Sequence, residues 1–152
     1  MREQVIQLLT AFFGSLGFAI SFQLRRSLWL VASLGGLLSW GCYLAAFAVT
    51  GQVFFSSLLA SIFAALYSEL LAAWKKAPTT LFVIPSVIPL IPGSSLYYTM
   101  RAVVTGNTKE ASSYGALTLQ WSLSIAAGIC VVWTLGFLVR RSWRQKGTSP
   151  AN

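Results

Sequence analysis

The segment 84–98, IPSVIPLIPGSSLYY, joins prolines, a glycine and serines in an otherwise apolar run. Proline lacks a backbone donor and clashes with the preceding turn, so each proline weakens or bends a helix. A helix that restarts at Gly93 would offer free amide groups and a positive dipole end to a carboxylate. Ser94 and Ser95 would add hydroxyls at N-cap-like positions. We therefore predict a substrate site here, formed by Pro89, Pro92, Gly93, Ser94, Ser95 and Tyr97.

A second interpretation of the same segment is structural. Proline-kinked helices are tolerated in membranes when neighbouring Ser or Thr side chains satisfy the freed carbonyls. The prolines would then only shape a helix that fills a bundle. Both interpretations remain open at the level of sequence.

Three further polar residues are candidates for function. Glu69 is the one carboxylate within an expected span, which makes it a candidate proton or cation site. It could instead reach Lys75, Lys76 or water at the interface. Gln120 and Arg101 are candidate polar lining, although a helix–helix hydrogen bond and a snorkelling side chain are the simpler interpretations.

Other classes of chemistry lack the residues that they need. The chain has no histidine, and its two cysteines, Cys42 and Cys130, have no CxxC spacing. We therefore expect no metal site, no cofactor and no enzyme, since no nucleophile–base pair can be assembled. The net charge of +8 comes from short clusters between apolar runs, which does not resemble a nucleic-acid interface.

The composition predicts an all-α integral membrane protein. Of the 152 residues, 56% are hydrophobic and 9% are charged, whereas soluble domains carry about 25% charged residues. Apolar runs long enough to cross a bilayer predict five spans. We expect them at residues 5–24, 28–49, 54–74, 80–104 and 111–139, within one domain, 1–140. A short basic cytoplasmic tail, 141–152, follows, and we expect its last part, 145–152, to be disordered.

The basic residues predict an orientation. A fully crossing but broken fourth span places most of them on one side: Arg25, Arg26, Lys75, Lys76, Arg140, Arg141, Arg144 and Lys146. Positive residues mark the cytoplasmic face, so we expect an external N-terminus and a cytoplasmic C-terminus. A re-entrant fourth segment would break this charge pattern.

Mostly small residues that recur on one side of a helix predict its packed face, with a substrate lining as the alternative interpretation. The spacing is strictly i+4 in the third and fifth spans and mixed in the first. The expected faces are Ser57, Ser61, Ala65, Glu69 and Ala73 in the third span; Ser112, Ala116, Gln120, Ser124 and Gly128 in the fifth; and Thr10, Gly14, Gly17 and Ser21 in the first.

The run from Val87 to Met100, VIPLIPGSSLYYTM, resembles the corresponding segment of the threonine/serine exporter family. The shared core is I-P-x-x-P-G-x-x-x-Y, from Ile88 to Tyr97. Length and span layout are similar to those of its small stand-alone, YjjB-like subunits.

The resemblance implies an exporter built from two five-span halves in the bacterial cytoplasmic membrane. The partner would be a larger, YjjP-like membrane subunit, with a homo-oligomer as the alternative. The substrate would be threonine, serine or a dicarboxylate such as succinate. The competing interpretation is a non-transporting assembly or regulatory subunit.

Overall fold

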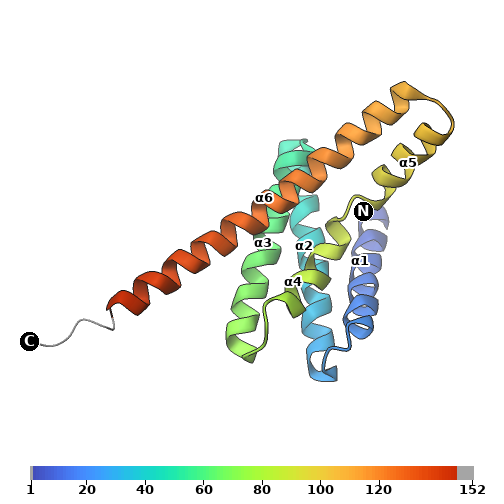
Figure 1. Ribbon diagram of the computed structural model, residues 1–152. Helices are drawn as coiled ribbons and strands as arrows, with labels where there is room; N and C mark the ends of the chain where they lie inside the picture. Colours follow the sequence, from blue (N-terminus) through green and yellow to red (C-terminus); the bar gives the residue numbers. More distant parts are fainter. Residues whose placement is uncertain (1, 147–152) are drawn as a thin grey trace, which may run out of the picture.

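The computed structural model describes the backbone of residues 2–146 and the side chains as far as Leu138. The described part is helical, with no strand, which confirms the all-α fold (Figure 1). Its elements are α1 (Arg2–Ser21), α2 (Arg26–Thr50), α3 (Val53–Lys75), α4 (Thr80–Val87), a 3₁₀ turn η1 (Ile88–Leu90), α5 (Gly93–Val104) and α6 (Thr108–Lys146).

Within the described residues, four helices are long and apolar enough to cross a membrane by themselves, and α4 with α5 forms a fifth, broken candidate. The expected spans agree with these elements to within a few residues, except that α6 is longer. With 39 residues, α6 is about 58 Å long at 1.5 Å per residue. It runs through Lys146, so the first residues of the expected tail are helical, and residues 147–152 lie outside the described part.

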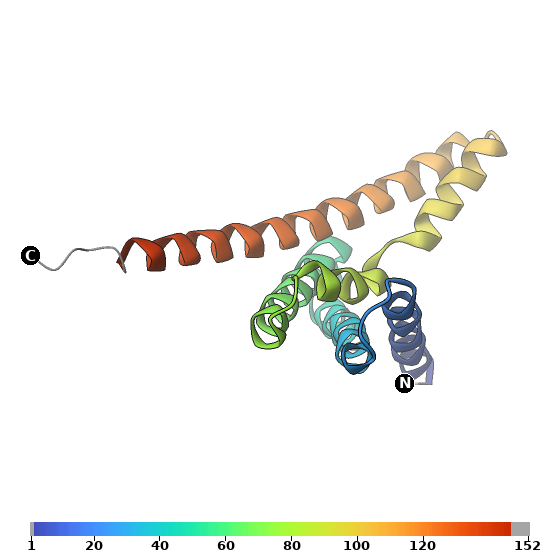
Figure 2. The same ribbon diagram turned by 60° about the horizontal axis from the view of Figure 1, so that its bottom comes forward.

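Helices α1, α2 and α3 lie side by side, and α4 packs on α2 and α3 (Figures 1 and 2). The chain then turns by 56° between α4 and α5. It continues away from the end where α3 stops, and it does not fold back (Figure 1). The α4–α5 segment thus extends from one end of the bundle toward the other.

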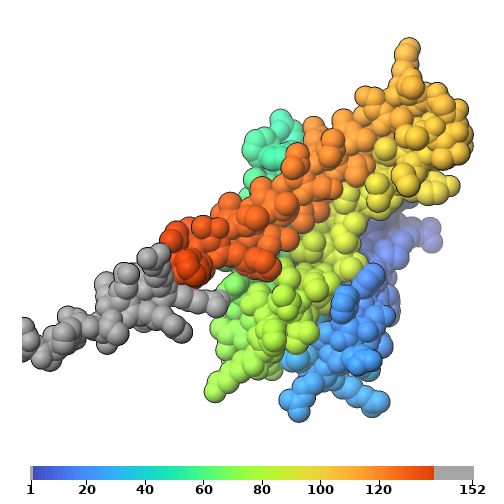
Figure 3. Space-filling model, viewed as in Figure 1, coloured from blue at the N-terminus to red at the C-terminus, as the bar shows by residue number. Residues whose placement is uncertain are grey.

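Helix α5 pairs with the first part of α6 to form a hairpin that projects from the bundle (Figures 2 and 3). The rings of Tyr98 and Tyr114 stack with centroids 5.2 Å apart across this pair. Gly106, with φ of 72°, makes the turn that joins the two helices. The remainder of α6 crosses the bundle against α3.

Small residues bring α3 and α6 into close contact. Ser57 and Ser124 form a hydrogen bond of 2.5 Å between their hydroxyl oxygens. A Cβ atom on Gly128 would collide with Ser61 Oγ, so only glycine permits this approach. The expected packed faces are therefore correct for Ser57, Ser61, Ala65, Ser124 and Gly128, all of which are buried.

Other expected packing residues lie elsewhere. Thr10, Gly14, Gly17 and Ser21 are exposed, and α1 instead buries Ala11, Ser15 and Ala19. The expected buried face of α1 was therefore wrong, because the residues that are buried begin one position later in the sequence. Ser112 and Ala116 are also exposed, in the first part of α6 that pairs with α5, and Gln120 is exposed further along the same helix.

Candidate functional site

The break between α4 and α5 is buried on one side by α1. Pro89 has no backbone N–H, so the carbonyl of Pro85, four residues earlier, loses its helical donor. Ser15 Oγ replaces that donor, with a hydrogen bond of 2.8 Å to Pro85 O. Both residues are fully buried. The packed face of α1 therefore supplies the polar group that the proline removes.

Two consecutive glycines of α2 make room for this contact. A Cβ atom on Gly36 would collide with Ser15 Oγ and would lie 3.1 Å from Pro85 O. One on Gly35 would collide with Ser86 Oγ, which donates to Phe82 O at 2.8 Å. The Gly35–Gly36 pair is thus the surface against which the broken segment lies.

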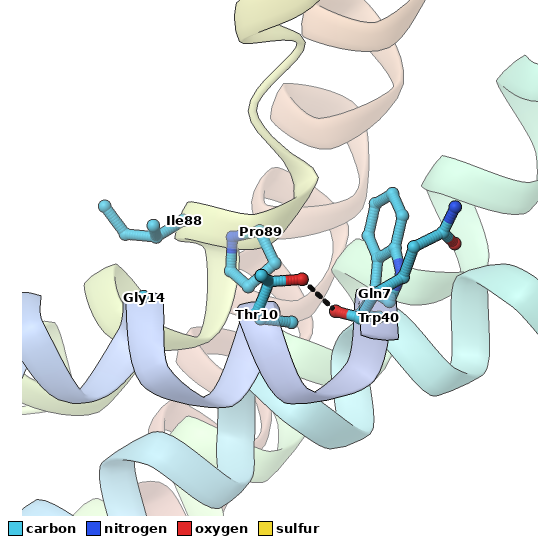
Figure 4. Close-up of a pocket in the computed structure, with 7 residues that line it drawn as sticks. Gln7, Thr10, Gly14, Trp40, Ile88 and Pro89 are labelled. Carbon is cyan, nitrogen blue, oxygen red and sulfur yellow. Dashed lines mark hydrogen bonds between the residues drawn. The ribbon is translucent and has the colours of Figure 1, made fainter. Parts of the chain in front are cut away.

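A cavity of about 260 Å³ opens beside the break, and we call it the break cavity. Three helical elements meet there (Figure 4), and the lining residues are Gln7, Thr10, Ala11, Gly14, Trp40, Ile88 and Pro89. Pro89 is the one predicted site residue among them. The cavity lies between α1 and η1, where the chain is held by the Ser15–Pro85 bond.

The lining offers polar groups without charge. Gln7 carries an amide, and the Thr10 hydroxyl donates to backbone carbonyls of its own helix, so its oxygen remains an acceptor. Trp40 Nε1 is buried and has no hydrogen-bond partner among the described residues. An unpaired buried donor costs about 1–3 kcal/mol. This N–H has almost no accessible surface, so a solute in the cavity would reach it only after neighbouring side chains move. This set of groups can bind a small polar solute that carries no net charge.

The remaining predicted substrate residues lie outside this cavity. Pro92 is half-buried and precedes α5, while Gly93 and Ser94 are exposed. Gly93 N already donates to Ile91 O at 2.8 Å. Ser95 is half-buried, and Tyr97 is 64% exposed and packs edge-on against Tyr98. These residues form the start of the projecting hairpin.

Glu69 lies in a third place. It is half-buried on α3 and lines a cavity of about 420 Å³ between α3 and α6. A Cβ atom on Gly136 would lie 3.8 Å from Glu69 Oε2, which is ordinary van der Waals contact, so α6 passes directly beside the carboxylate. Arg101 and Gln120 are exposed on α5 and α6. The structure therefore distributes the predicted site residues over the break cavity, the hairpin and the α3–α6 cavity.

Several residues beside the break were not singled out from the sequence as site residues: Ser15, Gly35, Gly36, Trp40 and Gln7. One signal was available, because Ala11, Ser15 and Ala19 are small residues at i+4 spacing. A second was the glycine pair within an apolar span. Nothing in the sequence marks Trp40 or Gln7, since only the tertiary arrangement brings them to Pro89.

The comparisons with known proteins agree with the resemblance carried by the proline-rich segment. No curated protein and no solved structure matches the chain. A family model described as "Threonine/Serine exporter, ThrE" matches residues 7–135. This match includes α2 to α5 in full, most of α1 and α6, and with them the break and its cavity. The chain therefore belongs to the threonine/serine exporter family, a family of membrane transporters.

Proposed function

We propose that this chain is one subunit of a secondary exporter and that its break cavity contacts the transported solute. The observation that carries the proposal is the position of the cavity, between α1 and a helix break that α1 itself stabilises. Broken helices in transporters commonly expose backbone groups to substrate near the membrane midplane. Movement of α1 relative to η1 would open or close the cavity toward one side of the membrane, and alternating access needs the complementary opening toward the other side.

The lining favours a zwitterionic amino acid over a dicarboxylate. No charged residue lines the cavity among the described residues. A dianion such as succinate would lose its hydration without a compensating charge, which is costly. Threonine and serine carry no net charge and present a hydroxyl in addition. Succinate remains the alternative substrate that export measurements should include.

Other parts of the proposal concern the partner and coupling. The larger, YjjP-like membrane subunit would supply the second half of the transporter, and a second copy of the chain is the alternative.

Glu69 would carry the coupling proton or cation. Replacing it with Gln should abolish the pH dependence of export if it carries a proton, and an unchanged pH profile would remove that role.

A pair of glycines on α1 gives a matched test of the cavity. Gly14 lines it, Gly17 does not, and a Cβ atom at either position would meet no other atom within 4 Å. Gly14→Leu should fill the cavity and abolish threonine and serine export from proteoliposomes that contain the chain and its partner. Gly17→Leu should leave export unchanged. Equal export by the two variants would contradict a substrate role for the cavity.

The non-transporting role remains a competing proposal, supported by the Ser15–Pro85 bond, which is what a purely structural kink requires. Gly93→Leu tests whether the substrate site extends to the start of α5, because Gly93 is exposed and a Cβ atom there would meet nothing within 4 Å. Gly93→Leu should reduce export, with partner binding intact, if the start of α5 contacts substrate. Loss of partner binding in a co-purification assay would favour the assembly role instead.

A further inference from the structure

A second cavity lies at the opposite end of the bundle from the α5–α6 turn, where two loops meet. Its volume is about 380 Å³, and it is lined from the α1–α2 turn and the α3–α4 turn. Both turns lie at the same end of the bundle (Figure 1). Three cationic side chains surround it: Arg25, Lys75 and Lys76. Gln23 and Ser27 add uncharged polar groups. We call it the basic cavity.

The charge of the basic cavity is uncompensated within the described structure. No acidic residue is among the described residues that line it. Like charges held close together repel, and an anion between them would remove that cost. The chain's own C-terminal segment is a poor occupant, because it carries Arg140, Arg141, Arg144 and Lys146. The occupant that fits is therefore an anion from outside the chain.

The backbone is strained at the same place. Gln23 and Lys76 have φ values of 54° and 50°, and they are the non-glycine residues with positive φ in the described part of the chain. Both line the basic cavity. Both residues end a helix in the left-handed cap conformation, with Leu24 N donating to Ala19 O and Ala77 N donating to Ala72 O, and this conformation costs a non-glycine residue about 1–2 kcal/mol. Two helix caps far apart in sequence thus lie at one cavity.

Two tryptophans beside cationic residues favour headgroup depth for this end of the bundle. Lys75 Nζ lies 4.5 Å from the ring centroid of Trp74, and the Arg26 guanidinium lies 5.9 Å from that of Trp29. Tryptophan is enriched at membrane–water interfaces, where its ring is amphipathic. Leu24, Leu28 and Leu81 give the cavity an apolar side that a soluble anion would not use.

We propose that the basic cavity binds the phosphate group of an anionic phospholipid, with the glycerol and upper acyl chain against the leucines. A free phosphate offers the same charge without the apolar part. Binding would hold the α1–α2 and α3–α4 turns together from the headgroup layer. The proposal is independent of substrate transport, so it can fail without affecting the proposed function.

The test uses the purified chain in nanodiscs made of phosphatidylcholine with added phosphatidylglycerol. It compares how much phosphatidylglycerol the wild type and each variant retain. Arg25→Gln with Lys75→Gln removes two cations from the cavity. Arg2→Gln with Lys109→Gln removes one arginine and one lysine from helix starts away from it. Each cation near a membrane surface contributes about fivefold to anionic lipid binding. The cavity variant should retain about 25-fold less phosphatidylglycerol, and the control should match the wild type.

A second pair of variants separates charge from backbone strain. Lys76→Gly removes a cation and relieves a left-handed residue, whereas Gln23→Gly relieves the same strain and keeps the charge. Both should remain folded by circular dichroism, and lipid retention should fall about fivefold in Lys76→Gly alone. Equal retention in the cavity and control variants would overturn the proposal. Thermal stabilisation by inorganic phosphate, without any by phosphatidylglycerol, would overturn the assignment to lipid.

Discussion

Ser15 is the residue on which the geometry of the break depends most directly. Its hydroxyl is the donor to the Pro85 carbonyl, and both groups are buried. Ser15→Ala should lower the free energy of unfolding by about 1–2 kcal/mol, because the carbonyl would be left without a donor. Thermal unfolding in nanodiscs measures this loss. Ser21→Ala, an exposed position on the same helix, should change stability little, and equal effects would contradict the role.

Trp40 gives the second prediction at this scale. Its indole stacks on Tyr43 with centroids 5.0 Å apart, so Trp40→Phe keeps an aromatic ring there while removing the buried N–H. Stability should be unchanged or slightly higher, since an unpaired donor is lost. If that donor binds substrate, the KM for threonine should rise about tenfold in export assays.

The control for this prediction is Trp133→Phe, which changes an exposed indole on α6. Its KM should equal that of the wild type. A Trp40→Phe variant with unchanged KM and unchanged stability would show that the N–H serves neither packing nor transport.

At the scale of elements, sequence reasoning succeeded where the cause is local. Proline acts on its own helix, so Pro85, Pro89 and Pro92 predict the break from sequence alone, and the structure confirms it between Val87 and Gly93. The positions of the long helices agree similarly with the lengths of the apolar runs. These properties need no knowledge of the neighbouring helices.

Sequence reasoning failed where the packing of a neighbouring helix decides which residues are buried. On α1, the stripe through Gly14 and the stripe through Ser15 differ by one residue, which is about 100° around a helix. Both contain small residues, and only α2 and the broken segment determine which one is buried. The same holds for Trp40, whose position beside Pro89 follows from the crossing of α1, α2 and η1.

The contact between α3 and α6 supports a matched prediction. Gly→Ala in a helix interior normally gains about 1 kcal/mol from helix propensity. Gly115→Ala should show that gain, because its Cβ would meet Thr99 at an ordinary 3.6 Å. Gly128→Ala should instead destabilise the protein, because its Cβ would collide with Ser61 Oγ. Unfolding midpoints compare the two, and a stabilising Gly128→Ala would show that α6 does not depend on this approach.

At the scale of the whole molecule, the basic cavity and the α5–α6 turn lie at opposite ends of the structure. The α4–α5 segment begins beside the first and ends at the second (Figure 1). A fully crossing segment should therefore place Thr80 and Lys109 on opposite sides of the membrane. A re-entrant segment should place them on the same side. The positive residues around the basic cavity predict that its side is cytoplasmic.

Single cysteines at these two exposed positions decide between the models. The background would carry Cys42→Ala and Cys130→Ala, which remove both native thiols. In intact cells, a membrane-impermeant maleimide should label Lys109→Cys and should leave Thr80→Cys unmodified until the membrane is permeabilised. Labelling of both positions in intact cells, or of neither, would show that the segment re-enters. The break would then line an opening from one side only, and alternating access through it would need a different movement from the one proposed.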